Sequence, residues 1–513
     1  MEYFLLYSMG GSLLLSLIAG AISIFWLSPV WKWCRLRKNG LSGPSPHFPL
    51  GNLMEMSKKG EASAAPVTHD IHSSVFPYFS RWRNAYGKTF VYWLGTEPFL
   101  YVADPEFLKR VTSGAMGKKW GKPNVFKHDR RPMFGTGLVM ADGDDWTRHR
   151  HIISPAFSMT NLNAMISVMQ ETTNKMLKEW GEQLALGQHE IDVEIGVTKN
   201  AAEIIAKTSF GISEEKGKKV FEKLQLMQKM LFKTNRLVGV PLGKMLSAKK
   251  SYQAWKLGKE IDQLLFAIIS SRKQEYDSND GGSTTHRDLL GLLLAGNQDN
   301  AQLERKLTTR ELVDECKTFF FGGHETTALA LSWTLLLLAL HPEWQTALRD
   351  ELMQVSGGRS LDSTMLSRLT KMGWVWNEVL RLYPPAPNVQ RQAREDVETG
   401  DGVVIPRGTN MWVDAVGMHH DPALWGDDAN EFRPERFKEE IHGGCKHRMG
   451  FVPFGFGGRI CIGRNLTLME FKIVLSLILR EFSLTLSPSY SHSPRIMLSL
   501  RPSQGVQLIL NKI

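Results

Sequence analysis

A glycine-rich loop around Cys461 is the part of the sequence best suited to chemistry. Four glycines crowd this cysteine in the run Phe454-Gly455-Phe456-Gly457-Gly458-Arg459-Ile460-Cys461-Ile462-Gly463. Glycine lets the backbone come close to another object, and free N–H groups at a helix N-terminus favour the thiolate over the thiol. A bare Gly-x-Cys-x-Gly is more often a turn with a buried cysteine. The full run is more specific and predicts a metal-ligating thiolate beneath a flat cofactor.

An acid and an alcohol stand side by side in Gly322-Gly323-His324-Glu325-Thr326-Thr327, inside a predicted apolar helix. A charged Glu325 is costly there. The plainer alternative is a threonine that bonds back to the preceding turn and a glutamate paired elsewhere. The functional interpretation is that the Thr326 hydroxyl donates a hydrogen bond to a reacting group while Glu325 relays protons.

Two further patterns carry charge at helical spacing. Trp146-x-x-x-Arg150 puts an indole N–H and a guanidinium on one helix face. Glu378 and Arg381 form an i,i+3 pair, which taken alone is most often a weak surface pair.

These motifs occur in one order along almost the whole chain, and in that order the sequence resembles the cytochrome P-450 monooxygenases. Within that family it resembles the plant enzymes of clan seventy-two, and among them family seven hundred and fifteen, through His69-Asp70-Ile71-His72 and Trp146-Thr147-Arg148-His149-Arg150. The resemblance implies a heme b group (haem below) whose iron is held by the Cys461 thiolate, a ligand that favours O–O cleavage. It implies catalytic roles for Thr326 and Glu325, and a buried network of Glu378, Arg381 and Arg436. The residues that it implies as haem-binding are Trp146, Arg150, Arg391, Phe454, Arg459 and Cys461.

The resemblance also implies the reaction, which is oxygen insertion into an unactivated C–H bond. The electrons are expected from NADPH through a separate NADPH-cytochrome reductase, because no G-x-G-x-x-G fingerprint opens a βαβ unit here. The expected pocket walls are 120–123, 205–245, the face near Phe320 and Ala330, and 386–389. They are mostly apolar, so the expected substrate is an apolar small molecule. The resemblance to the clan implies a terpenoid, a hormone-like isoprenoid or a fatty acid.

Two other functions stay open from the sequence. A haem-thiolate isomerase or dehydratase would not use dioxygen, and relatives of that kind tend to lack the acid–alcohol pair that Glu325 and Thr326 form. A non-catalytic haem protein would need neither a proton relay nor a substrate channel. Consumption of NADPH with reductase and a candidate substrate separates the three.

The helices and strands that position these motifs are predicted to form a mainly α structure with a smaller β region (α+β). The resemblance implies that this is the cytochrome P-450 fold. Residues 90–95 and 99–102 are strand-like, and 160–275 are mainly helical. A polar loop is predicted at 276–286. A long buried helix is predicted from an N-cap at Thr309 to about His341, and a last helix from about Gly463 to Phe482.

The N-terminus reads as a membrane anchor. No charged residue lies between Glu2 and Lys32, and cations follow at once. Residues 3–27 are long enough to span a bilayer, and the positive flank predicts a cytosolic catalytic domain on the endoplasmic reticulum. A cleaved signal peptide is the alternative, but its charge would precede the apolar run. Residues 28–50 read as a basic flank and Pro-rich hinge, and 51–513 as the haem-thiolate domain.

Composition sets broad limits on the class of protein. Four cysteines are too few for a disulfide scaffold. The net charge of +10 is spread thinly, and no Lys/Arg block predicts nucleic-acid binding. The excess fits either a solvated basic surface or attraction to an acidic partner or anionic lipid.

Overall fold

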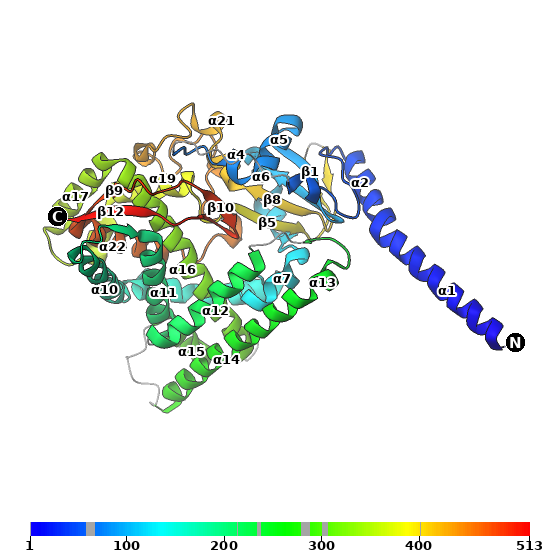
Figure 1. The fold of residues 1–513 in the computed structure, drawn as a ribbon, viewed down its shortest axis with the longest axis horizontal. Helices are drawn as coiled ribbons and strands as arrows, with labels where there is room; N and C mark the ends of the chain where they lie inside the picture. Colours follow the sequence, from blue (N-terminus) through cyan, green and yellow to red (C-terminus); the bar gives the residue numbers. More distant parts are fainter. Residues whose placement is uncertain are drawn as a thin grey trace.

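The computed structural model describes residues 2–57, 67–212, 214–232, 237–278, 288–299, 306–400 and 402–513. A mainly helical body carries its main sheet at one end and a smaller sheet near the C-terminus at the other, and a long N-terminal helix projects from the end with the main sheet (Figure 1). This arrangement confirms the predicted fold class. Most of the predicted polar loop 276–286 lies outside the described residues.

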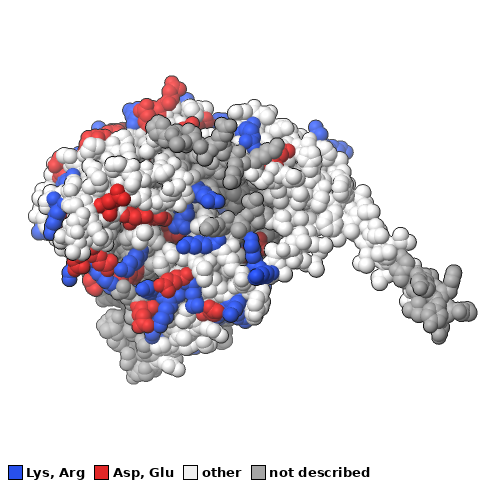
Figure 2. Space-filling view, in the orientation of Figure 1, with Lys and Arg blue, Asp and Glu red and all other residues white. Residues whose placement is uncertain are grey.

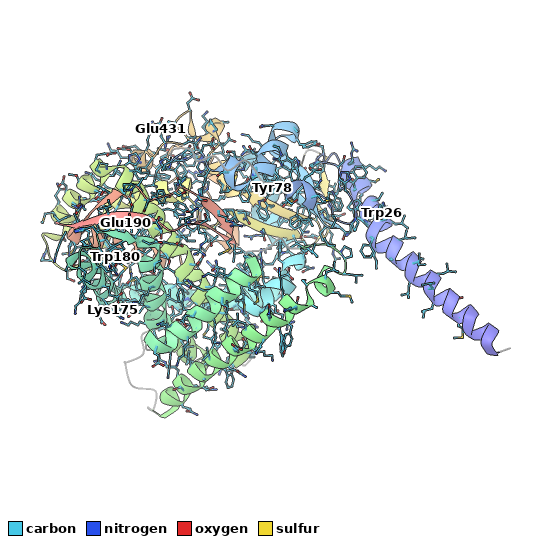
Figure 3. The ribbon with its side chains drawn as sticks, in the orientation of Figure 1. Trp26, Tyr78, Lys175, Trp180, Glu190 and Glu431 are labelled. Carbon is cyan, nitrogen blue, oxygen red and sulfur yellow. The ribbon has the colours of Figure 1, made fainter. Side chains whose placement is uncertain are left out.

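The N-terminal helix is continuous through a π-helical turn. It consists of α1 (Glu2–Ile22), the turn Ser23–Leu27 and α2 (Ser28–Lys38). Among the described residues one unbent helix, Ser12–Lys38, is long and apolar enough to cross a membrane. Trp26 lies on it clear of the body (Figure 3), and the described part that projects shows no charge (Figure 2).

The base of this helix is docked on the body. Leu36 is buried, Arg35 pairs with Asp396 at 3.1 Å, and Asn39 Nδ2 donates to the Val404 carbonyl at 2.8 Å. The Pro-rich segment that follows lies along a strand, since the Val91 N–H donates to the Ser42 carbonyl at 2.8 Å. The first part of the expected hinge is therefore a helix held by side-chain contacts.

The main sheet has the order β1-β2-β8-β5-β3. Strands β1 (Thr89–Leu94) and β2 (Glu97–Val102) are the two that the sequence predicts, and they pair antiparallel around a turn at Gly95 and Thr96. Strand β2 pairs parallel with β8 (Asn410–Asp414), which pairs antiparallel with β5 (Asn388–Ala393). β3 is the short strand Trp120–Gly121. Strands β1 and β2 are buried on both faces, which explains their continuous apolar runs.

The long helix α16 (Thr309–Leu340) runs through the centre of the body and is buried from Thr327 to Leu338. Its N-cap is Thr308, so the prediction of Thr309 is wrong by one residue. Thr308 and Glu311 form a capping box, in which each side chain bonds the other's backbone N–H. Of the two threonines, only Thr308 lies three residues before Glu311 and can close that ring. The helix after the cysteine loop, α22 (Arg464–Glu481), is as expected.

The remaining elements surround α16. The helices are α3 (Leu53–Met56), α4 (His72–Val75), α5 (Pro77–Tyr86), α6 (Pro105–Thr112), α7 (Asn124–Phe134), α8 (Gly143–Ile153), α9 (Met159–Asn163), α10 (Ile166–Ala185), α11 (Val193–Phe210), α12 (Glu214–Phe232), α13 (Gly243–Leu246), α14 (Ala248–Ser278), α15 (Leu289–Asp299), α17 (Pro342–Ser356), α18 (Ser363–Arg368), α19 (Thr370–Leu382), α20 (Ala415–His419) and α21 (Pro422–Trp425). The other strands are β4 (Glu190–Asp192), β6 (Val397–Glu398), β7 (Val404–Ile405), β9 (Phe482–Leu486), β10 (Pro494–Met497), β11 (Ser499–Pro502) and β12 (Gln507–Lys512).

Candidate active site around Cys461

The cysteine loop closes on itself just before α22. The Cys461 N–H donates to the Phe454 carbonyl at 2.9 Å, and Gly455 and Gly457 have φ of 76° and 64°, a conformation that favours glycine. The Cys461 side chain is accessible to solvent. Burial of the loop nevertheless raises the pKa of the Cys461 thiol, against the N–H groups of Gly463 and Arg464 and the charge of Arg150. A coordinated metal ion deprotonates a thiol outright, so a bound metal would keep this sulfur as the thiolate.

One face of α16 opens in the middle of the buried helix. Gly322 is exposed, and a Cβ placed there would meet no atom within 4 Å. The half-exposed Thr326 lies one turn later, and its hydroxyl donates to the Gly322 carbonyl at 2.8 Å. Thr327 bonds back in the same way but is fully buried. Both threonines therefore make the plainer back-bond, and only Thr326 also faces open space.

Gly323, the second glycine of the Gly322-Gly323 pair, has a packing role. A Cβ on Gly323 would lie 2.4 Å from Ile205 Cδ1. Gly323 therefore lets α11 pack closely against α16, and only Gly322 leaves room beside the helix.

A short run of contacts connects this face with the cysteine loop. A Cβ on Gly463 would lie 3.9 Å from Cys461 Sγ and 4.0 Å from Phe157 Cε1. The Phe157 ring is 5.9 Å from the ring of Phe319, which lies one turn before Gly322. Phe157 therefore lies between the cysteine loop and the part of α16 just before Gly322.

Side chains from α8 hold the cysteine loop. Arg150 donates to the Ile460 carbonyl at 2.9 Å, and Arg459 stacks on Trp146 with 4.6 Å from guanidinium carbon to ring centroid. Arg459 also pairs with Asp142 at 3.0 Å. Burial alone would raise the pKa of Asp142, but hydrogen bonds from Lys127 and the Lys122 N–H lower it.

Positive charge exceeds negative charge behind this loop. Arg391 is 5% exposed and donates to its neighbour's carbonyl, Gln390 O, at 2.9 Å. Burial and the charge of Arg459 lower the pKa of Arg391 to about 10. Burial and the same two arginines lower the pKa of Lys122 well below its ordinary value. Neither cation has a carboxylate partner within the described part of the chain.

A buried cation is stable only when it is paired. Lys122, Arg391 and Arg459 converge with Asp142 as their one nearby carboxylate. They therefore suit a ligand with more than one carboxylate, and the accessible sulfur and flat glycine loop suit its metal. These residues fit haem, whose two propionates would be held by the cations and whose iron would be held by Cys461. The sequence marks Lys122 only as a pocket wall, because no motif identifies it.

The structure places Glu325 apart from Thr326. The Glu325 side chain is 1% exposed, and its Oε1 accepts from Ser499 Oγ at 2.5 Å and from Gln228 Nε2 at 2.8 Å. Within the described residues no hydrogen bond or ion pair joins it to Thr326. Sequence reasoning missed Gln228 and Ser499, which are remote in the chain.

The pair Glu378 and Arg381 is fully buried. Two bonds of 2.7 and 2.8 Å join the side chains, and Arg381 also donates to the carbonyls of His419, Ala429 and Glu431. Arg436 lies 3.5 Å from Glu378. The network therefore ties α19 to the segment that leads into the cysteine loop, and the weak surface pair is excluded.

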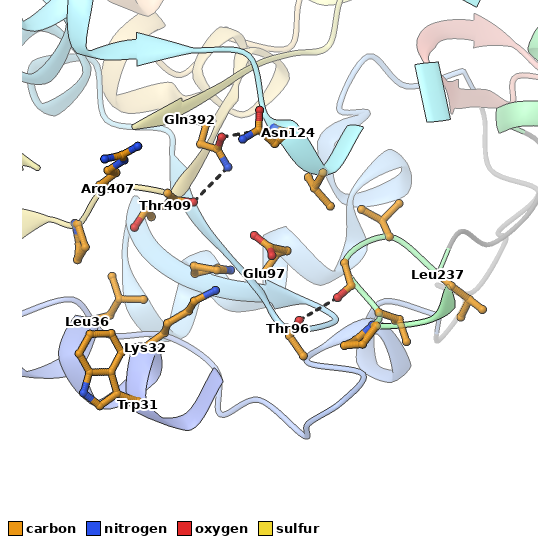
Figure 4. A pocket seen from close by; sticks show the side chains of 18 of the residues that line it. Trp31, Lys32, Leu36, Thr96, Glu97, Asn124, Leu237, Gln392, Arg407 and Thr409 are labelled. Atoms are coloured by element: carbon orange, nitrogen blue, oxygen red, sulfur yellow. Dashed lines mark hydrogen bonds between the residues drawn. The ribbon is translucent and has the colours of Figure 1, made fainter. Parts of the chain in front are cut away.

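A cavity of about 750 Å³ lies where the base of the anchor helix, the β1–β2 turn and the segment 237–245 meet (Figure 4). Trp31, Leu36, Leu237 and Leu242 supply apolar wall. Burial raises the pKa of Glu97 inside it, although Lys32 opposes the rise.

The segment 237–242 is fastened to the β1–β2 turn. The Thr96 N–H and hydroxyl donate to the Gly239 carbonyl at 2.9 and 3.1 Å. A Cβ on Gly239 would lie 2.0 Å from the Leu94 carbonyl oxygen, and one on Gly95 would lie 2.1 Å from Gly239. Two glycines therefore allow this contact.

The chain is similar along almost its whole length to known plant proteins. Residues 43–510 match the family described as Cytochrome P450. A protein of Arabidopsis thaliana named cytokinin hydroxylase is 38% identical over 98% of this chain and 96% of its own length. Cytochrome P450 714C2 of Oryza sativa subsp. japonica is 36% identical over 96% of this chain and 95% of its own. Cytochrome P450 734A1 of Arabidopsis thaliana is 35% identical over 98% of this chain and 96% of its own length.

Proposed function

The chain belongs to the cytochrome P450 family, and from that premise we propose that it hydroxylates an apolar small molecule with electrons from an NADPH-cytochrome reductase. Members of the family are haem-dependent monooxygenases. The observation that carries the proposal is the site itself. The site combines an accessible cysteine sulfur with the open Gly322–Thr326 face of α16. It also has two cations, Lys122 and Arg391, that have no carboxylate partner in the part of the chain that the structure describes.

Bound haem supplies the iron centre at which dioxygen is activated. Cys461 would hold the iron, while Arg150 fixes the carbonyl of the preceding residue and so fixes the loop. Trp146, Arg391, Arg459 and Lys122 would hold the propionates, and the Phe454 carbonyl keeps the Cys461 backbone in place. Thr326 offers a hydroxyl on the open face of α16, and Glu325 supplies its protons.

The substrate classes that we propose are a terpenoid, a hormone-like isoprenoid or a fatty acid. Two relatives in Arabidopsis thaliana are named cytokinin hydroxylases, which supports a hormone-like small molecule. We further propose membership of clan seventy-two and of family seven hundred and fifteen within it.

The anchor supports a place on the endoplasmic reticulum. We propose that residues 3–27 span the membrane once, that 28–50 connect them to the body, and that 51–513 form the cytosolic monooxygenase domain. The cations Lys32, Arg35, Arg37 and Lys38 support this orientation. The cavity at the anchor base supports access of an apolar substrate directly from the bilayer, because the anchor helix forms part of its wall.

The decisive experiment is a screen of difference spectra on the holoenzyme with terpenoids, cytokinins and fatty acids, followed by turnover. Compounds that displace an iron-bound water should be hydroxylated only when reductase, NADPH and dioxygen are all present. Turnover without dioxygen would identify an isomerase or dehydratase instead. Binding with no NADPH consumption for every ligand would identify a non-catalytic haem protein.

A further inference from the structure

Tyr383, a fully buried tyrosine at the C-terminal end of α19, has unusual neighbours for a packing residue. Its ring stacks on the buried Trp333 of α16, with 4.3 Å between the ring centroids and 16° between the ring planes. Its hydroxyl is hydrogen-bonded to His69 Nδ1 at 2.8 Å and to His492 Nε2 at 3.4 Å. One partner is enough to satisfy a buried phenol. The stacked indole and the two imidazoles therefore suit a phenol that exchanges electrons and protons.

The hydrogen bonds continue from Tyr383 to the surface. His492 Nδ1 is bonded to the Tyr490 hydroxyl at 2.8 Å. The side chains of His492 and Tyr490 are half-buried, and the neighbours of Tyr490 in the chain, Ser489 and Ser491, are exposed. A row of aromatic and imidazole rings thus leads from the centre of α16 to the loop before β10.

Both imidazoles of this row are neutral at ordinary pH. Burial lowers the pKa of His69 to about 3 and the pKa of His492 to about 4. A neutral imidazole has one donor nitrogen and one acceptor nitrogen. The shorter bond makes His69 Nδ1 the acceptor of the Tyr383 proton. His492 Nε2 then donates to the Tyr383 oxygen, and His492 Nδ1 accepts from Tyr490, so the three bonds run in one direction.

Trp333 connects this row with the candidate active site. It follows Thr326 on α16 by about two turns, so the two residues lie within about 20° of each other around the helix and about 10.5 Å apart along it. The Trp333 Nε1–H donates to the Leu500 carbonyl at 3.2 Å. A carbonyl is not a base of useful strength, so an indole that loses an electron here keeps its proton.

We propose that Trp333, Tyr383 and Tyr490 form an electron path that supplies single electrons to an oxidised haem when no substrate consumes its oxidising power. Trp333 gives one electron to the oxidised haem. Tyr383 then gives one electron to Trp333 and its phenol proton to His69, because an oxidised phenol is a strong acid. The path goes beyond the proposed hydroxylation and needs only the haem that the family binds.

Tyr490 restores Tyr383 in the next step. Tyr490 gives one electron to Tyr383 and its phenol proton to His492 Nδ1, while His492 Nε2 gives its own proton to the Tyr383 oxygen. His492 is left as its other neutral tautomer, which proton exchange resets. A small reductant at the surface, such as ascorbate, supplies one electron to Tyr490, and solvent supplies its proton. His69 releases its proton to solvent, so the net change is one electron passed from the reductant to the haem.

The test is a peracetic acid reaction of the full-length ferric holoenzyme, frozen within milliseconds and examined by electron paramagnetic resonance. The wild type should give a tyrosyl radical signal that narrows when the protein contains ring-deuterated tyrosine. Tyr383→Phe and Trp333→Phe should each lose most of that signal. Tyr490→Phe should keep a tyrosyl signal with a different hyperfine splitting, because Tyr383 then holds the radical.

Tyr92→Phe is the matched control for the radical signal. Tyr92 is also fully buried, but its hydroxyl has no hydrogen-bond partner within the described residues, so its loss should leave the signal unchanged. The second measurement is ascorbate oxidation in the same reaction. It should fall in Tyr383→Phe and in Tyr490→Phe, and stay at the wild-type rate in Tyr252→Phe, which removes an exposed tyrosine of α14.

A tyrosyl signal of equal size in the wild type and in Tyr383→Phe would overturn the proposal. So would an equal loss of signal in Tyr92→Phe, since any buried tyrosine would then have the same effect. If Tyr383→Phe binds no haem, Tyr490→Phe decides alone, and an unchanged splitting there counts against the path. Failure of the proposed function is distinguishable, because the peracid reaction uses no reductase, NADPH or substrate.

Discussion

Replacing Gly239 by alanine should release the segment 237–242 from the β1–β2 turn. The added Cβ would lie 2.0 Å from the Leu94 carbonyl oxygen, and Gly239 has φ of 71°. Backbone cannot yield at that distance, so the segment must move away. Movement breaks the two hydrogen bonds from Thr96 to the Gly239 carbonyl.

The free-energy cost of undocking the segment follows from the left-handed backbone and the two lost hydrogen bonds. A left-handed conformation costs an alanine about 1 kcal/mol. Each lost hydrogen bond costs about 0.5–1.5 kcal/mol. The sum is roughly 2–4 kcal/mol against the docked segment, which is roughly a thirtyfold to thousandfold change in the ratio of docked to released forms.

Hydrogen exchange at the Thr96 amide measures this ratio directly, because that N–H is protected only while the segment is docked. Protection should fall by the same factor. Binding of 4-phenylimidazole to the haem, followed by absorbance, should become faster if the cavity at the anchor base is the route inward. Gly87→Ala is the matched control, since Gly87 has φ of 83° but open space around its Cβ position. Equal Thr96 exchange in the two variants would refute the role of the close contact.

Three further outcomes test the site. Cys461→Ser should abolish the long-wavelength band of the reduced carbon monoxide complex, because a hydroxyl is a poor iron ligand. The control variants Cys34→Ser, Cys316→Ser and Cys445→Ser should keep that band. A band retained in Cys461→Ser would exclude Cys461 as the ligand. Thr326→Ala should keep haem content but lower the ratio of product to NADPH oxidised by about a hundredfold or more, and a larger loss in Thr327→Ala would transfer the role to that neighbour. The His149 ring is hydrogen-bonded to Glu315 at 2.6 Å. Burial lowers the pKa of His149, but the carboxylates of Glu315 and Glu311 have the larger combined effect and raise that pKa above the ordinary 6.5. The raised pKa stabilises the fold fully below about pH 6.5, and the contribution is lost as pH rises through the folded value; denaturant titrations should show this fall in the wild type, and an equal fall in His149→Gln would contradict the assignment.

Local patterns allowed the helices and the two paired strands to be predicted because their periodicity reflects burial on one face or on both. The N-cap of α16 is a position where this reasoning is wrong by one residue. Thr308 and Thr309 are both acceptable caps by type, and only the reciprocal bonds with Glu311 choose Thr308. The apparent surface pair Glu378 and Arg381 shows a larger failure, because i,i+3 spacing is the same for an exposed pair and for a fully buried one.

The cysteine loop, the acid–alcohol pair and the apolar anchor can each be identified from the amino-acid sequence, because each is a contiguous run whose chemistry is local. The residues that surround them are set by the tertiary structure. Lys122 joins Arg391 behind the cysteine loop, and Glu325 meets Ser499 across 174 residues of chain. Such contacts depend on how helices and strands pack, and a side chain's partner in a folded core is set by distance in space, which spacing along the chain does not encode.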